Sequence, residues 1–123
     1  MGVDAMKFKI AILQMKSLNR QYQKNTDIVV EKMEEASENG ADILLLPEAF
    51  ITGYELPVSN DEALADNNRY FRQICDAAKK LKVGVIVTAI TKGSSKPQNS
   101  AIVIDKNGNS LMKYSKVHTC DFA

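Results

Sequence analysis

The stretch Ala41–Phe50, ADILLLPEAF, decides the fold of this chain. Its strand, expected over Ala41–Leu46, carries four apolar residues in succession, which is typical of a strand buried on both faces of a parallel sheet. Pro47 ends the strand because proline has no N–H to give to the ladder. Glu48 follows at once, so a carboxylate is expected at the carboxyl end of a buried strand, where open α/β sheets place their active sites.

The residues before this stretch predict a strand and a helix. The run Phe8–Met15 contains no turn residue and indicates a second strand buried on both faces. Residues Gln21–Asn39 carry apolar side chains at helical spacing and predict an amphipathic helix. Asn19 is the expected N-cap of this helix, and Gly40 stands where a left-handed residue is wanted after its end.

The residues after Glu48 predict a long loop, a helix and a closing hairpin. Residues 49–66 show no period and contain glycine and proline, so a loop is expected, of a length that is often functional. The pair Asn107-Gly108 is a strong hairpin signal, because both residues tolerate positive φ. The elements expected around it are a helix over Asn67–Lys82 and strands over Gly84–Thr91, Ser100–Asp105 and Leu111–Ser115. The order β-α-β-loop-α-β-β-β predicts an α/β fold whose mixed sheet begins parallel.

Composition narrows the classes of protein to consider. The 123 residues suffice for a single domain, 1–123, and the net charge of +1 gives no reason to expect nucleic acid or an anionic membrane as a partner. No apolar run is long enough to span a membrane, and the N-terminus does not resemble a signal peptide. Two cysteines that are not closely spaced favour reduced thiols, so we expect a cytoplasmic protein.

Two side chains stand out as candidates for chemistry. Glu48 is expected to be partly desolvated by its apolar neighbours, which would raise the pKa of the carboxyl group and suit a general base. The alternative is a carboxylate that caps the N–H groups of a neighbouring loop. Lys116, beside Tyr114 and His118, could stabilise a developing oxyanion, and its alternative is a solvated surface lysine.

Five short strings occur in a fixed order along the chain and together resemble the nitrilase, or carbon–nitrogen hydrolase, superfamily. The first strand also resembles the opening strand of that family, because it ends in a glutamine, Gln14. The resemblance extends over essentially the whole chain. The strings are Leu44–Glu48, Gly53-Tyr54, Asn99–Ala101, Asp105–Gly108 and Tyr114–His118.

The resemblance implies a fold and a reaction. Members of this family hydrolyse non-peptide C–N bonds of small amide, nitrile or carbamoyl substrates with a Glu-Lys-Cys triad and without a metal or organic cofactor. Glu48 matches the general base and Lys116 matches the lysine that stabilises the oxyanion. The implied fold is the N-terminal part of a four-layer α-β-β-α sandwich with a mixed sheet.

The chain departs from the family pattern at the nucleophile. The family's cysteine follows the lysine at the end of a further strand, in a Cys-Tyr-Asp or Cys-Trp-Asp element, and a second glutamate precedes it. Neither is found in these 123 residues. We therefore expect a partial domain that is inactive alone. The alternatives are a non-catalytic α/β interaction module and a divergent hydrolase that uses Cys120.

The two cysteines have separate interpretations. A nearby His118 could activate Cys120, but the family match places Cys120 in a loop and not at the position of the nucleophile. His118, Cys120 and Asp121 also lack the spacing of known zinc motifs, so no metal site is predicted. Cys75 lies on the predicted second helix beside its apolar stripe and is interpreted as a packing residue.

A partial domain of this kind would leave apolar strand faces and edges uncovered. We therefore expect the chain to form a homo-oligomer or to bind a complementing C-terminal part.

Overall fold

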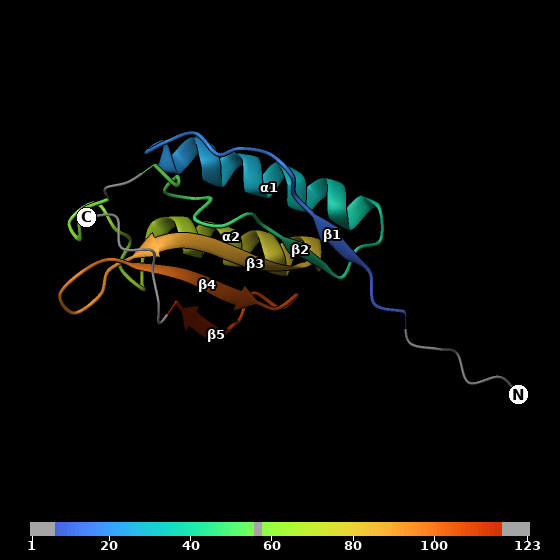
Figure 1. Ribbon diagram of the computed structural model, residues 1–123. Coiled ribbons are helices and arrows are strands. Elements are labelled where there is room, and N and C mark those ends of the chain that lie inside the picture. The colour runs from blue at the N-terminus through green and yellow to red at the C-terminus, as the bar shows by residue number, and fades with distance from the viewer. Residues whose placement is uncertain (1–6, 56–57, 117–123) are drawn as a thin grey trace, which may run out of the picture.

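The computed structural model describes residues 7–55 and 58–116 of the chain. Within these residues the elements follow the predicted order (Figure 1). They are β1 (Ile10–Ile12), α1 (Tyr22–Glu38), β2 (Ile43–Leu45), α2 (Arg69–Leu81), β3 (Gly84–Thr91), β4 (Gln98–Ile104) and β5 (Ser110–Ser115). A long loop separates β2 from α2, as expected. The bounds differ from the predicted ones by a few residues, most of all in β1, which is five residues shorter than the run Phe8–Met15.

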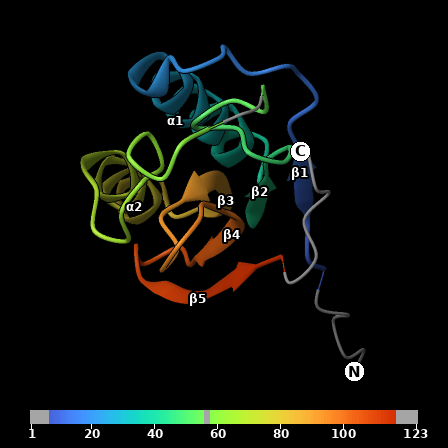
Figure 2. The same cartoon turned by 60° about the vertical axis from the view of Figure 1, so that its left-hand side comes forward.

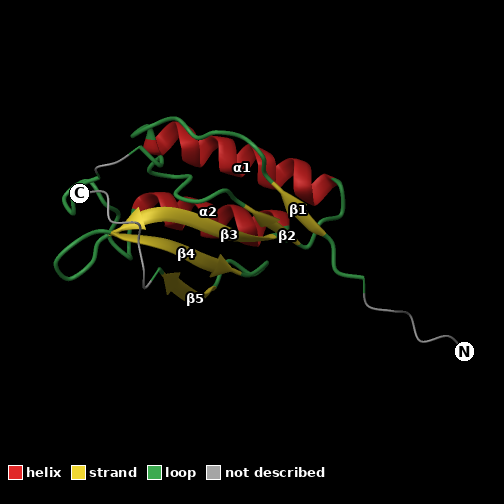
Figure 3. Ribbon diagram, viewed as in Figure 1, coloured by secondary structure: helices red, strands yellow, loops and turns green. Residues whose placement is uncertain are grey.

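The five strands form one mixed sheet in the order β1-β2-β3-β4-β5 (Figure 3). β1 pairs with β2 and β2 with β3 in parallel, and each connection carries its helix or its long loop and helix. The pairs β3–β4 and β4–β5 are antiparallel. The predicted parallel start and mixed sheet are confirmed. The carboxyl ends of β1, β2 and β3 therefore lie at one end of the sheet.

Both helices pack on one face of this sheet, which we call the covered face (Figure 2). Alternate strand residues such as Leu44, Val85 and Ile102 point into this layer, since side chains of a strand alternate between the two faces. They meet Val29 and Met33 of α1, and Phe71, Ile74 and Ala78 of α2. The hydrophobic core of the described residues lies between the helices and this face.

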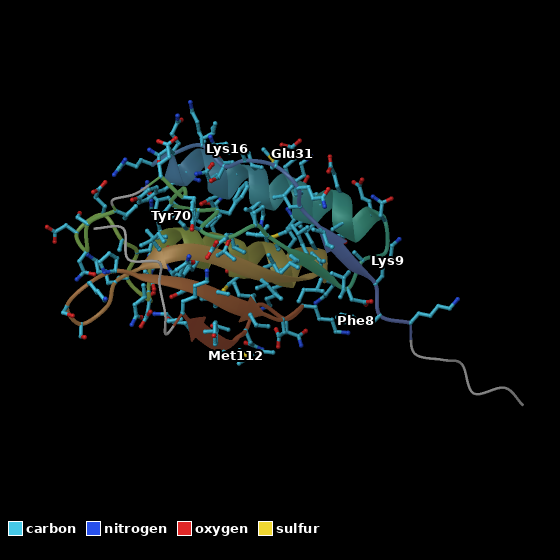
Figure 4. The ribbon with its side chains drawn as sticks, in the orientation of Figure 1. Phe8, Lys9, Lys16, Glu31, Tyr70 and Met112 are labelled. Atoms are coloured by element: carbon cyan, nitrogen blue, oxygen red, sulfur yellow. The ribbon has the colours of Figure 1, made fainter. Side chains whose placement is uncertain are left out.

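The opposite side of the sheet, which we call the open face, carries an apolar row that crosses all five strands. Its members are directly paired neighbours: Ile12, Leu45, Ile86, Val103 and Met112. Ile12 and Met112, at the two ends of the row, are 62% and 59% exposed. Met112 lies on the side of the sheet away from α1 (Figure 4). No described helix covers this row.

The open face corrects the prediction that the first strand is buried on both faces. β1 is the edge strand of the sheet, and its Ile10 and Ile12 are exposed. Only the next residue along, Leu13, is buried. β2 is also covered on one face alone, because Leu44 is buried whereas Ile43 and Leu45 are half-buried. An apolar sequence shows that both faces can be buried, but not that this chain supplies both covering layers.

The ends of the helices agree with the sequence in part. Asn68 caps α2 by accepting a hydrogen bond from Phe71 N–H at 2.9 Å. Gly40 adopts the left-handed conformation that was predicted after α1, with φ of +75°. The predicted cap at Asn19 is wrong: α1 starts later, at Tyr22, and its N-cap Gln21 makes no side-chain capping bond.

The turn between β4 and β5 is stabilised by hydrogen bonds within the turn and packs closely against α2. The Asp105 carboxylate accepts hydrogen bonds from Asn107 N–H and Asn109 N–H, both at 2.9 Å. Gly108 has φ of +82°, and a Cβ at this position would lie 2.6 Å from the carbonyl oxygen of Cys75 on α2. The turn predicted at Asn107-Gly108 is therefore confirmed, and Gly108 also permits close contact with the helix.

Neither α1 nor α2 combines the length and the apolar character needed to cross a membrane, and no other helix is found in the described residues. The cytoplasmic location stays a prediction.

Candidate active site

Glu48 lies just beyond the end of β2, in a turn that β3 holds in place. Thr88 on β3 donates a hydrogen bond to the carbonyl oxygen of Pro47 and accepts one from Phe50 N–H at 3.1 Å. Ile51 N–H bonds the main-chain carbonyl of the same threonine at 3.0 Å. Ala49, between these anchors, is buried and has φ of +53°, a conformation that costs energy in a residue other than glycine. The two anchors hold the turn so that Glu48 projects from it.

Lys116 reaches this carboxylate from β5, the edge strand opposite to β1. It directly follows β5, and its N–H donates to the main-chain carbonyl of Asn99 on β4 at 2.9 Å. Its ammonium forms an ion pair with Glu48 Oε1. The structure thus brings together the two site residues that were predicted from the sequence, although 67 residues lie between them in the chain.

Asn99 is the third member of a cluster that it forms with Glu48 and Lys116. Its Nδ2 donates to Glu48 Oε1 at 2.5 Å, so the same carboxylate oxygen receives both the amide and the ammonium. No role was predicted for this residue, because a lone asparagine next to a strand usually indicates a turn. Its place in the string Asn99–Ala101 was the available signal.

A chain of hydroxyl groups lies one residue away from the cluster and joins three strands. Thr91 Oγ1 and Ser100 Oγ lie 2.7 Å apart, and Ser100 Oγ and Ser115 Oγ lie 2.8 Å apart. These contacts connect β3, β4 and β5 directly beside Asn99 and Lys116. They help to fix the register in which the two residues lie opposite each other.

The carboxylate and the ammonium are both partly exposed. The Glu48 side chain is 39% exposed and the Lys116 side chain 47% exposed, which agrees with the partial desolvation predicted for Glu48. The buried neighbours Ala49 and Phe50 cover it from one side only. The other side opens toward the rim of the open face, since Asn99 and Lys116 continue the alternation of Val103, Ala101 and Tyr114. An exposed ion pair contributes little to stability.

Two hollows flank the cluster. A cavity of about 380 Å³ touches Glu48 and is walled mainly by apolar groups, among them Met15, Phe50 and Tyr54. A more polar cavity of about 340 Å³, between the loop 94–98 and Ser115, touches Lys116. A small molecule could thus approach both charged groups. The site offers a proton acceptor, a fixed positive charge and space beside each.

The remaining candidates are placed as follows. His118, Cys120 and Asp121 lie outside the described residues. Cys75 is partly buried and packs against the core, as predicted. Burial raises the pKa of its thiol, and the charges of Asp76 and Asp105 raise it further, so this thiol is a poor source of thiolate. Across residues 7–55 and 58–116, no three His, Cys, Asp or Glu side chains gather in a way that could hold a metal ion.

Comparison with known proteins assigns a family to this arrangement. The profile described as carbon–nitrogen hydrolase matches residues 9–122. A 2-oxoglutaramate amidase of Bacillus subtilis is 31% identical over 77% of this chain, and a protein of Staphylococcus aureus named hydrolase in agr operon is 28% identical over 89%.

Solved structures share the fold. A mutant of the amidase from Nesterenkonia sp. AN1, with the acetamide moiety of fluoroacetamide added covalently at its active-site cysteine, superposes with a TM-score of 0.74 at 24% identity. This match covers 90% of the chain and 43% of the amidase. The chain likewise spans 36% of the B. subtilis relative and 42% of the S. aureus relative. It therefore corresponds to less than half of the proteins it matches.

Proposed function

This chain belongs to the carbon–nitrogen hydrolase family, and from that premise we propose that it carries the general base and the oxyanion-stabilising cation of an enzyme that hydrolyses non-peptide carbon–nitrogen bonds. The observation that carries this proposal is the contact between Glu48 and Lys116, which follow β2 and β5 and meet at the rim of the open face. The substrates proposed are small amides, nitriles or carbamoyl compounds.

In the proposed reaction Glu48 takes the proton of a cysteine thiol, and the thiolate attacks the electrophilic carbon of the substrate. For an amide, the electron pair of the C=O bond moves to oxygen, and the Lys116 ammonium stabilises the resulting negative charge. Collapse of this tetrahedral intermediate breaks the C–N bond and forms a thioester, while the protonated base supplies a proton to the leaving amine. Water then hydrolyses the thioester and regenerates the thiol. Apart from the substrate and the water, each of these steps uses side chains alone.

The cysteine of this triad is proposed to come from a part of the enzyme other than the described residues. Two observations support this. The apolar row on the open face is suited to pack against another layer, and the cluster lies at the rim of that same face. The chain also corresponds to less than half of the Nesterenkonia amidase, whose active-site cysteine bears the covalent adduct. We propose that a complementing C-terminal part covers the open face, completes a four-layer sandwich and brings the nucleophile over Glu48.

The proposal is tested by measuring ammonia release from a panel of aliphatic amides, nitriles and carbamoyl compounds. The 123-residue chain is assayed alone and together with a separately expressed C-terminal part of a family member. We expect turnover only with both parts, and a loss of at least about 1,000-fold in kcat for Glu48→Gln or Lys116→Met. Glu38→Gln, on the exposed end of α1, is the matched control and should have no effect.

Two results would contradict the proposal. Turnover by the chain alone that disappears in Cys120→Ser would favour the divergent hydrolase. Formation of a complex without turnover, for a C-terminal part that is active with its own N-terminal half, would favour the interaction module.

A further inference from the structure

We infer that Asn99 is a positioning residue that fixes Glu48 Oε1 and thereby makes Oε2 the oxygen that accepts the proton. The catalytic part of this inference rests on the proposed function, whereas the contacts themselves do not. Asn99 bonds Glu48 through its side chain and Lys116 through its main chain, so a single residue places both members of the ion pair.

The two oxygens of Glu48 have different surroundings. Oε1 accepts from Asn99 Nδ2 and lies in the ion pair with the Lys116 ammonium. Within residues 7–55 and 58–116, the hydrogen bond from Asn99 is made at Oε1, and the ion pair with Lys116 is also formed through Oε1. A carboxylate oxygen that already accepts two donors is a poorer base than the other oxygen of the same group, because the donors stabilise its negative charge. The proton of an attacking nucleophile is therefore directed to Oε2.

An amide suits this position better than another donor. Asn99 is neutral at every pH, so it neither competes for the proton nor changes the net charge of the site. The amide orientation follows from its chemistry: a flipped side chain would turn a carbonyl oxygen toward a carboxylate oxygen, which is repulsive. A lysine or arginine here would hold the carboxylate more strongly but would weaken it as a base.

The backbone around Asn99 is fixed independently of its side chain. The bond from Lys116 N–H to the carbonyl of Asn99 belongs to the β4–β5 pairing, and the hydroxyl groups of Thr91, Ser100 and Ser115 join the neighbouring positions. Replacing the Asn99 side chain should therefore leave Lys116 in place. An Asn99 variant should therefore lose the hydrogen bond to Glu48 without losing the fold.

The first test observes Asn99 itself by NMR in the full chain. The side-chain NH₂ group of Asn99 should resonate downfield of that of exposed Asn67, because one of its protons is bonded to a carboxylate. In Glu48→Gln this proton should move upfield, while the Asn67 signals and the Lys116 amide stay unchanged. An Asn99 signal that does not respond to Glu48→Gln would overturn the inference. This test does not require an Asn99 variant to fold.

The second test uses the two-part enzyme described above. Asn99→Ala, and the isosteric Asn99→Asp, should lower kcat about 10- to 100-fold with KM changed less than about twofold, as expected for one lost hydrogen bond to a charged group. Asn67→Asp, which adds the same charge at an exposed site, is the control. Near-normal kcat in Asn99→Ala, with Glu48→Gln inactive, would overturn the inference alone. Full activity of Glu48→Gln would overturn the proposed function. The NMR test of the contact between Asn99 and Glu48 would remain valid in that case, because it does not depend on activity.

Discussion

The covered face and the open face of the sheet are built from alternate residues of the same strands, yet their surroundings differ. On β3, Val85 and Val87 are fully buried under the helices, whereas Ile86 between them faces the open side and is only half-buried. The two faces are similar in apolar character, since the row Ile12, Leu45, Ile86, Val103 and Met112 contains no polar residue. The difference lies in what packs on each face. Burial is therefore a property of the assembled layers rather than of the strand sequence.

The comparison also concerns chemistry, because Glu48 and Lys116 lie at the rim of the open face. Glu48 and Lys116 are 39% and 47% exposed at the rim of the same face on which Ile12 is exposed, and no described element packs over that row. A layer placed on the open face would bury the apolar row and remove water from the ion pair in one step. Electrostatic interactions strengthen when water is removed, so covering this face would stabilise the chain and activate the site together.

The largest effect is expected where the comparison is most direct, between two isoleucines. Ile74→Ala removes a fully buried side chain of α2 and should lower the free energy of unfolding by about 2–5 kcal/mol through lost transfer energy and a residual cavity. Ile12→Ala, on the open face, should change it by less than about 0.5 kcal/mol. Urea denaturation of both variants measures the difference. Equal losses would mean that the open face is covered in solution.

A smaller effect on stability is expected where the β4–β5 turn contacts α2. Gly108→Ala combines a left-handed backbone with a close approach to the Cys75 carbonyl of α2, and we expect a loss of about 2–3 kcal/mol. Gly40→Ala is the control, since Gly40 has a similar φ but no atom within 4 Å of an added Cβ. It should cost about 1–2 kcal/mol, from the backbone alone. Thermal unfolding of the two variants would contradict this account if Gly40→Ala were the less stable.

The same turn makes a small contribution that depends on pH. Hydrogen bonds from Asn109 N–H and then Asn107 N–H hold the pKa of Asp105 below its ordinary value of 3.8. Because the folded pKa is the lower one, the stabilisation is complete above about pH 4 and disappears as the pH falls through the folded value. Asp105→Asn should flatten the acid side of the stability profile and leave its shape between pH 5 and 8 unchanged. A variant whose profile remains as steep below pH 4 would show that this carboxylate does not contribute.

The smallest effect on stability is expected on the open face itself. Met112→Lys, alone or with Ile12→Lys, places a charge on exposed apolar positions and should change the free energy of unfolding by less than about 0.5 kcal/mol. If the expected association of the chain uses this face, the same variants should lower the average mass found by light scattering at high concentration. Lys24→Met, on the exposed side of α1, serves as a control for charge. A loss of stability similar to that of Ile74→Ala would contradict the distinction between the two faces.

The order of the elements could be predicted from the sequence because each leaves a local signal. Gly84–Thr91 was predicted with its observed bounds, since its β-branched residues lie between a glycine and a polar turn. The position of a strand within the sheet leaves no such signal. The apolar run around β1 is equally compatible with a central strand and with an edge strand, and the structure shows an edge strand.

The candidate site could be predicted only in part, for a related reason. Glu48 was indicated by its place after a strand, and Lys116 mainly by the family resemblance. The contact between them also depends on the register of β2 with β3 and of β3 with β4, which no local pattern encodes. Asn99 was missed because its role comes from two partners that are distant in sequence. The partial burial of Glu48 could be predicted because its sequence neighbours Ala49 and Phe50 are apolar, and they cover one side of it.

The irregular pairing near Leu111 determines which lengths of the hairpin keep Lys116 in place. Ile104 pairs with Ser110 and Val103 with Met112, so Leu111 is an extra residue on β5. Deleting one residue between Ser110 and Lys113 would remove this extra residue and could leave the later pairs unchanged, whereas deleting a second residue would turn Lys116 toward the helices. In the evolution of such chains, the loss of one codon in this part of β5 would therefore be tolerated better than the loss of two. The hairpin thus has one residue of spare length that can be lost without losing the contact with Glu48.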